Sequence, residues 1–253
     1  IPAAFLLKKT TGAGVVYDMH ENYRSKGPIL GAGLRMLERW CFRWVDHVFL
    51  AEKSYRPIVE GATVDHTYLA NYFTPIGDEG LEKEERKSAS SEPKQLLYTG
   101  TIANSRGLRT MLDLASEMQR RERRETLEMV GICYRSDQRA RAERRIQRDR
   151  LGQIINRVGW DEYVPASKMP PHYQAADVGL ALFEPHPNHV GSLLTKFYEY
   201  MHYGLPIICS DFPLWRRFVE ENAYGVVVPP GDVRAVLSVL DRWQAQPETY
   251  RGY

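Results

Sequence analysis

Short apolar runs alternate along the chain with longer amphipathic stretches, which is the pattern of strands separated by helices. In the first third, an amphipathic stretch from about residue 31 to 44 separates two of the strand-like runs. The three strand-like runs cover residues 13–20, 44–54 and 66–73. This alternation of strands and helices is typical of βαβ units, so the sequence predicts a parallel sheet.

Residues 76–94 lose the apolar pattern and collect charge, serine and proline, which predicts a linker. After it the alternation of strands and helices resumes and continues almost to the end of the chain. We therefore expect an α/β protein with two Rossmann-like domains. Residues 1–75 would form an incomplete first domain, and residues 95–253 a nearly complete, doubly wound parallel sheet.

Composition narrows the class of protein but not its activity. The chain has 253 residues, of which 43% are hydrophobic and 26% charged, so it can bury a sizeable core. A net charge of +2 gives no general reason to expect nucleic-acid binding. The chain begins Ile-Pro, which suggests a missing upstream part, and no apolar run is long enough for a spanning helix.

The arginine-rich segment from Arg120 to Arg150 leaves alternatives open. It is basic and helical in pattern, which would suit a nucleic acid or an anionic membrane surface. Acidic residues are interleaved with the arginines, which favours a solvated helix face. The three cysteines lie far apart in apolar contexts, which favours buried free thiols over a disulfide or a metal site. They are Cys41, Cys133 and Cys209.

The stretch LLTKFYEYMHYGLPIICSDFP, residues 193–213, carries the most specific pattern. Lys196 and Glu199 stand three residues apart, so both side chains project from one face of a predicted helix. They could form an ordinary surface pair, but the residues around them are apolar, which indicates burial. Gly191 and Ser192 could open this helix with free backbone N–H groups, as phosphate binding requires.

Two further loops follow predicted strands and reach the same edge of the sheet. Gly100 ends a strand and Arg106 precedes a helix, so a small residue allows close approach and a guanidinium could bind phosphate. Trp160 also follows a strand, and it could line a base pocket or simply pack in the core. Three such loops at strand carboxyl ends together favour a nucleoside diphosphate pocket.

The residues of these loops resemble a known family. The runs TKFYEYMHYGLPIICSDFPLWRRFVEE, LLYTGTIANSRGL, YQAADVGLALFEP and GVVVPPGD are similar to the donor domain of retaining glycosyltransferases of family 4, the group 1 enzymes with the GT-B fold. The similarity covers nearly all of residues 95–243. Residues 1–75 resemble the second half of the family's acceptor domain, which implies that the N-terminal part of that domain is missing here.

The resemblance implies roles for individual residues. Glu199 matches a motif carboxylate that would accept hydrogen bonds from the ribose of the donor. Lys196 and Arg106 match basic positions that would hold the diphosphate and stabilise the leaving group. The backbone amides of Ser192 and Leu193 would complete this cradle without a metal ion.

Other positions follow from the same resemblance. His20 would reach the donor sugar, while Gly100, Thr101 and Trp160 would contribute to the donor pocket. The chain departs from the family where the first glutamate of its Glu-x7-Glu motif would fall on Gly191. Glu184 or a backbone group could take over this role. Thr101 stands where the family often has a second basic residue.

The sequence thus predicts a retaining hexosyltransferase that transfers a sugar from a UDP- or GDP-sugar to a glycan or lipid-linked acceptor in polysaccharide or glycoconjugate synthesis. The resemblance implies no cofactor, no metal and no nucleic-acid partner, and a cytoplasmic location, with peripheral contact at the inner membrane face as one alternative. A sugar-nucleotide epimerase of the same architecture, and a nucleotide-binding fragment without turnover, are the other candidates.

Overall fold

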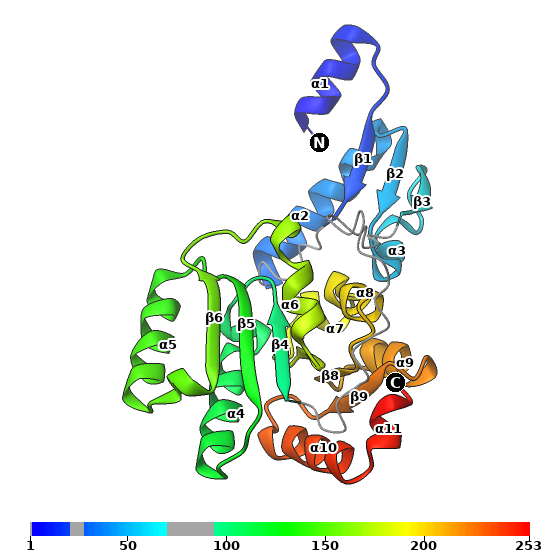
Figure 1. Cartoon of the computed structure of the whole chain (residues 1–253). Helices are drawn as coiled ribbons and strands as arrows, with labels where there is room; N and C mark the ends of the chain where they lie inside the picture. The colour runs from blue at the N-terminus through cyan, green and yellow to red at the C-terminus, as the bar shows by residue number, and fades with distance from the viewer. Residues whose placement is uncertain (1, 21–27, 70–93) are drawn as a thin grey trace. The chain divides into compact units, whose positions relative to one another are not determined.

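The computed structural model describes residues 2–20, 28–69 and 94–253 (Figure 1). The chain divides into two compact units. The first comprises Ile1–Tyr72 together with His186–Leu193, and the second comprises Phe73–Pro185 together with Leu194–Tyr253. The predicted linker over residues 76–94 lies almost wholly outside the described residues. The chain therefore leaves the second unit after Pro185, contributes a short segment to the first unit, and returns.

The first unit contains a parallel sheet of three strands in the order β1-β2-β3. The strands are β1 (Val16–Met19), β2 (His47–Leu50) and β3 (Asp65–Tyr68). Its helices are α1 (Pro2–Thr11), α2 (Pro28–Cys41), α3 (Arg56–Val59) and α7 (Pro187–Val190), with 3₁₀ turns over Phe42–Trp44 and Lys53–Tyr55. The core includes Met19, Phe42 and Val48, each at most 1% exposed.

The second unit contains a parallel sheet of six strands. The strands are β4 (Gln95–Thr99), β5 (Thr126–Ile132), β6 (Ile155–Trp160), β7 (Val178–Ala181), β8 (Ile207–Ser210) and β9 (Gly225–Val228). The helices are α4 (Leu108–Arg120), α5 (Ser136–Arg148), α6 (Pro170–Ala175), α8 (Thr195–His202), α9 (Pro213–Glu221), α10 (Val233–Ala245) and α11 (Pro247–Arg251), with 3₁₀ turns over Asn104–Arg106, Leu151–Gln153 and Ala166–Lys168.

Along the sheet the strands lie in the order β6-β5-β4-β7-β8-β9. When the strands are numbered by their order in the chain within this unit, the order along the sheet is 3-2-1-4-5-6. This is the order of a doubly wound Rossmann sheet. The strands are apolar on both faces, because helices cover both; Leu96, Leu97 and Tyr98 of β4 are all fully buried. Helix α10 packs on α4. The predicted α/β class and the parallel sheets are confirmed.

The strand positions follow the hydrophobic pattern closely, while several helices were not anticipated. Each of the three strand-like runs of the first unit overlaps a strand, although each strand has only four residues and β3 begins one residue before its run. The described helices that the pattern did not predict are α1, α3, α7, α9 and α11. Four of these start at a proline and α3 has Pro57 in its first turn; proline is pre-organised for the first turn of a helix but gives little periodic signal.

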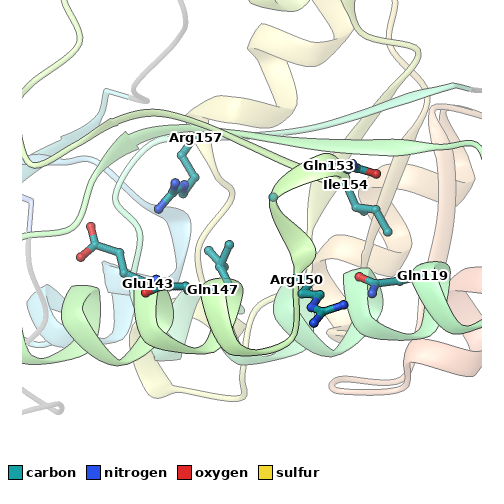
Figure 2. A pocket seen from close by; sticks show the side chains of 9 residues that line it. Gln119, Glu143, Gln147, Arg150, Gln153, Ile154 and Arg157 are labelled. Atoms are coloured by element: carbon teal, nitrogen blue, oxygen red, sulfur yellow. The ribbon is translucent and has the colours of Figure 1, made fainter.

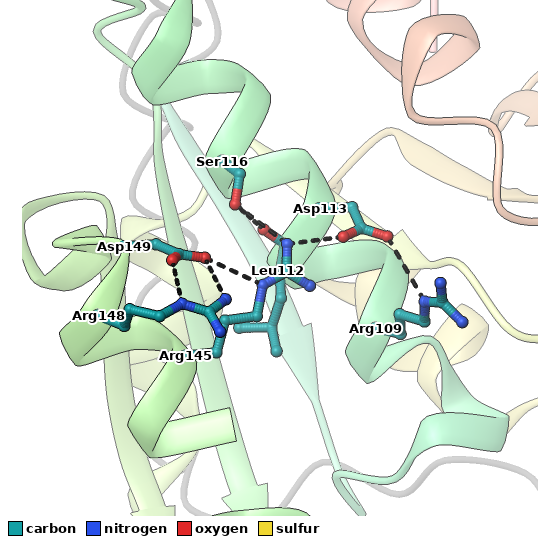
Figure 3. A network of polar contacts seen from close by, with 7 residues as sticks. All are labelled: Arg109, Leu112, Asp113, Ser116, Arg145, Arg148 and Asp149. Atoms are coloured by element: carbon teal, nitrogen blue, oxygen red, sulfur yellow. Dashed lines mark hydrogen bonds and ion pairs between the residues drawn. The ribbon is translucent and has the colours of Figure 1, made fainter. Parts of the chain in front are cut away.

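The arginine-rich segment forms part of an ion-pair network (Figure 3). Arg145 of α5 contacts Asp113 of α4 at 2.7 Å and Asp149 at 3.3 Å. Arg148 pairs with Asp149 at 2.7 Å, and Arg109 lies 4.0 Å from Asp113. Asp149, which is interleaved in the segment, therefore pairs with two of its arginines, as expected for a solvated helix face, while Asp113 outside the segment joins α5 to α4.

Candidate functional site

The strand order reverses direction between β4 and β7, and in open parallel sheets ligands bind outside the carboxyl ends of the strands at this point. The loop after β4 approaches the end of β7 closely at Gly107. Gly107 has a φ of 88°, and a Cβ there would lie 2.1 Å from the carbonyl oxygen of Leu182. Only glycine allows this approach, which brings the loop of Arg106 to the end of β7.

Lys196 lies at the same point and is 6% exposed. Its Nζ donates a hydrogen bond to the carbonyl oxygen of Thr99, the last residue of β4, at 2.6 Å. The ammonium also lies 3.8 Å from the ring centre of Tyr98 and 4.9 Å from that of Phe183. Two aromatic faces and one carbonyl thus hold a cation at the carboxyl ends of β4 and β7.

The surroundings of Lys196 disfavour its charge. Burial lowers the pKa of Lys196 well below its ordinary value, and the nearby charge of Arg106 lowers it further, while Glu199 acts in the opposite direction. A buried cation of this kind lowers the stability of the folded protein. Such perturbed groups cluster at functional sites, where a ligand of opposite charge compensates the cost.

Glu199 stands one turn further along α8 and is held by a tyrosine from α6. The hydroxyl of Tyr173 donates to Oε2 of Glu199 at 2.6 Å. Burial and the adjacent carboxylate raise the pKa of Tyr173, so this hydroxyl stays a donor. One carboxylate oxygen is thereby engaged, and the side chain is fixed relative to the switch point. The predicted burial of this helix is confirmed, since Phe197 and Tyr200 are fully buried.

Arg106 ends the 3₁₀ turn after β4 and is half-buried. Its guanidinium carbon lies 5.8 Å from the ring centre of Phe183, which also faces the ammonium of Lys196. The structure therefore brings the two predicted basic residues to the same aromatic ring. The two positive charges repel each other, and binding of an anion would relieve this repulsion.

The start of α8 differs from the expectation that Gly191 and Ser192 open the helix. Helix α8 begins at Thr195, with Leu194 as its N-cap. The backbone N–H of Ser192 donates to His189 at 3.3 Å, and that of Leu193 donates to the carboxylate of Glu52. Neither amide is free, because the preceding segment folds as the short helix α7 and belongs to the first unit.

His20 follows β1 in the first unit. Its Nε2 lies 2.8 Å from Oδ2 of Asp18, and the imidazole is half-exposed. The backbone carbonyl of His20 accepts a hydrogen bond from the hydroxyl of Tyr55 at 3.2 Å. Asp18 therefore orients the ring, as a carboxylate does for a histidine that transfers or donates a proton. The predicted role of His20 toward a donor sugar stays a prediction.

The remaining predicted residues occupy different surroundings. Gly100 lies beside Lys196, where a Cβ would be in ordinary van der Waals contact with Nζ at 3.9 Å, and its φ of 100° is the feature that favours glycine. The carbonyl of Thr101 accepts a hydrogen bond from Tyr98 at 2.6 Å. Trp160 is 4% exposed and donates its indole N–H to Met129 at 3.3 Å. Its surroundings are those of a core residue, so its role in a base pocket stays a prediction.

A separate cavity lies beside β6, which is an edge strand of the second sheet (Figure 2). Its volume is about 830 Å³, and it lies beside the amino end of β6 and the C-terminal ends of α4 and α5. The side chains that line it are mainly amides and charged groups, among them Gln119, Glu143, Arg150 and Arg157. None of the predicted site residues lines it.

The sequence also matches a known family over most of the second unit. Residues 93–244 match the family of glycosyl transferases group 1. This match extends over more than half of the chain. The chain belongs to the group 1 glycosyltransferases.

Solved glycosyltransferase structures share the fold of this group 1 chain. Sucrose-phosphate synthase from Thermosynechococcus elongatus superposes with a TM-score of 0.68 at 19% identity, over 98% of this chain and 63% of that one. Anabaena HepE, solved in complex with UDP and glucose, gives a TM-score of 0.69 at 14% identity, over 98% of this chain and 67% of that one.

Staphylococcus aureus TarM, solved with UDP and an α-GlcNAc-glycerol among its ligands, gives 0.67 at 12% identity, over 96% of this chain and 48% of that one. At these identities the similarity shows the GT-B fold alone. The chain spans less than two thirds of the length of the synthase. No curated protein sequence matches it.

Several residues around Lys196 and Glu199 in this candidate site were not found from the sequence. Tyr98 and Phe183, which face Lys196, lie within or just after apolar strands and look like core residues. Tyr173, which donates to Glu199, lies on a short helix that gives little signal in the sequence. Among the described residues no group of three or more His, Cys, Asp or Glu could hold a metal ion, and no described helix could cross a membrane.

Proposed function

We propose that the chain binds a nucleoside diphosphate sugar and transfers the sugar, with retention of anomeric configuration, to a hydroxyl of a glycan or lipid-linked acceptor. The observation that carries the proposal is the buried ammonium of Lys196 at the switch point, held 2.6 Å from the carbonyl of Thr99 with Arg106 nearby. Membership of the group 1 glycosyltransferases supports the same chemistry.

In the proposed reaction the bond between the anomeric carbon and the diphosphate oxygen breaks, and the acceptor hydroxyl oxygen bonds to that carbon on the same face. The electron pair of the broken bond stays on the diphosphate, which Lys196 and Arg106 stabilise. The acceptor proton passes to the leaving phosphate oxygen. Preorganised cations at the leaving group lower the barrier without a covalent intermediate.

Donor recognition in this proposal involves further residues. Glu199, whose Oε2 is held by Tyr173, accepts hydrogen bonds from the ribose through its other oxygen. His20, oriented by Asp18, contacts the donor sugar. With a lipid-linked acceptor, the enzyme works at the cytoplasmic face of a membrane. UDP is the first nucleotide to test, since HepE and TarM have been solved with it.

The test is calorimetric titration of the chain with UDP, GDP and ADP, with and without their sugars. We expect one nucleotide to bind with micromolar affinity and to lose that affinity in Lys196→Ala and Glu199→Ala. Turnover is then assayed by release of the nucleotide in the presence of acceptors and by the anomeric configuration of the product. Inversion of configuration would refute retention, and interconversion of the donor sugar without an acceptor would indicate an epimerase.

A further inference from the structure

Glu52 is a carboxylate that the proposed reaction does not use, and it stands in an unusual place. It follows β2 in the first unit and accepts a hydrogen bond from the backbone N–H of Leu193. Leu193 is the last residue that the 186–193 segment contributes to the first unit, three positions before Lys196. The carboxylate of Glu52 therefore accepts a hydrogen bond from the backbone amide of a residue that lies just before the start of α8.

A second contact fixes the same segment against the turn that follows β2. A Cβ at Gly191 would lie 3.7 Å from both Cβ and Oγ of Ser54, which is ordinary van der Waals contact. The backbone at residues 191–193 thus runs along residues 52–54. Glu52 is half-buried, in keeping with a side chain that lies against this segment.

The chemistry of this contact is that of phosphate binding. A backbone N–H binds carboxylate and phosphate oxygens in the same way, with charge-assisted hydrogen bonds. The resemblance to family 4 glycosyltransferases implies that the Leu193 amide contacts the donor diphosphate, and we include it in the proposed donor site. We infer that Glu52 is an internal anion that holds the Leu193 amide in the free protein and competes with the diphosphate for it. This inference rests on the proposed function.

The protonation of Glu52 makes the competition measurable. Burial raises the pKa of Glu52 to about 7, against the opposing effect of the Leu193 hydrogen bond. Several charged or titratable groups of the described part of the first unit contact partners of their own. These are Lys53 over the ring of Tyr68, Arg56 with Glu60, His20 with Asp18, and His186 with His189.

The sign of the effect follows from the charges. Neutral Glu52 accepts a weaker hydrogen bond from the Leu193 amide than the carboxylate does, and it does not repel a diphosphate. Diphosphate binding therefore favours the protonated form of Glu52 and is accompanied by uptake of a proton. With a pKa of about 7, about one molecule in eleven is protonated at pH 8 and most are at pH 6. If only this form binds, the wild-type affinity at pH 8 is about tenfold below its intrinsic value.

The experiment compares UDP titrations of the full chain as wild type, Glu52→Gln and Glu52→Ala at pH 6 and pH 8, with GDP and ADP in parallel. Glutamine keeps an acceptor for Leu193 but no charge. The matched control is Glu60→Gln, which removes an exposed carboxylate of the same unit that pairs with Arg56. Buffers of different ionisation enthalpy report the proton uptake, and circular dichroism confirms folding of each variant.

We expect Glu52→Gln to bind UDP about tenfold more tightly than wild type at pH 8, with the two converging at pH 6, and the Glu60 control to match wild type. The proton uptake of wild type should disappear in Glu52→Gln. Equal affinities at both pH values, or weaker binding by both Glu52 variants, would overturn the inference alone. If no protein binds any nucleotide at either pH, the proposed donor site itself is wrong.

Discussion

Replacement of Lys196 by methionine should weaken nucleotide binding while it leaves the free energy of unfolding nearly unchanged. Methionine fills a similar volume but removes a charge that is 6% exposed and pressed against the rings of Tyr98 and Phe183. Removal of a buried charge relieves its desolvation cost, and even whole buried ion pairs can be replaced by apolar residues with a neutral or stabilising effect of about 1 to 4 kcal/mol. Against this gain, the carbonyl of Thr99 loses its 2.6 Å donor, which costs about 1 to 3 kcal/mol.

The two effects are of similar size, so the unfolding free energy of Lys196→Met should stay within about 1 kcal/mol of wild type. Loss of a charged hydrogen bond to the diphosphate should cost about 1.5 to 3 kcal/mol, or roughly 10- to 150-fold in nucleotide affinity. Lys168→Met is the matched control, because Lys168 is exposed on a 3₁₀ turn of the same unit. It should change neither quantity.

The pH dependence of unfolding gives an independent check. The pKa of Lys196 is lowered in the folded protein, so between that pKa and the ordinary value of 10.5 the unfolded chain binds more protons. The stability of wild type should therefore rise with pH across this window relative to Lys196→Met. Urea unfolding measures both proteins, and titration calorimetry measures nucleotide affinity. A variant that is destabilised by about 3 kcal/mol or more, yet binds nucleotide normally, would show that Lys196 is a structural residue.

Three further outcomes follow from the structure. Tyr173→Phe leaves Oε2 of Glu199 without its donor, so calorimetry should show nucleotide affinity reduced about fivefold, for a loss of about 1 kcal/mol; unchanged affinity would contradict the proposed role of this pair. Gly107→Ala places a Cβ 2.1 Å from the carbonyl oxygen of Leu182 at a positive φ, so urea unfolding should show a loss of about 3 kcal/mol or more. Gly152→Ala, which meets nothing within 4 Å, is its control, and equal midpoints for the two variants would refute the steric argument. A thiol reagent at pH 8 should label no cysteine in the native protein and all three in urea, since all are at most 2% exposed; rapid native labelling would show that the packing is loose. The cysteines are Cys41, Cys133 and Cys209.

The strands and the parallel sheet were predictable because apolar runs bounded by polar turns are a local signal. Six runs after the linker correspond to β4 through β9, and the strand order then follows the usual winding of such sheets. Helices α7 and α9 were missed, since a short helix after a proline has little periodicity. The predicted domain limits stay a prediction.

The candidate site was only partly predictable. Lys196 and Glu199 could be paired from their spacing, and Arg106 from its place after a strand. The partners that define their chemistry come from elsewhere along the chain. Thr99 precedes Lys196 by 97 positions and Tyr173 precedes Glu199 by 26, and no local pattern marks either contact.

The sequence by itself determined the α/β class, the parallel strands and the membership of the group 1 glycosyltransferases, because these depend on periodicity and on motifs of neighbouring residues. Only the tertiary structure decided that Lys196 is a buried cation with a lowered pKa, and that the amide of Leu193 is taken by Glu52. Burial and charge compensation are set by atoms that folding brings together from distant segments. A pKa is therefore a property of the folded surroundings, which spacing along the chain does not report.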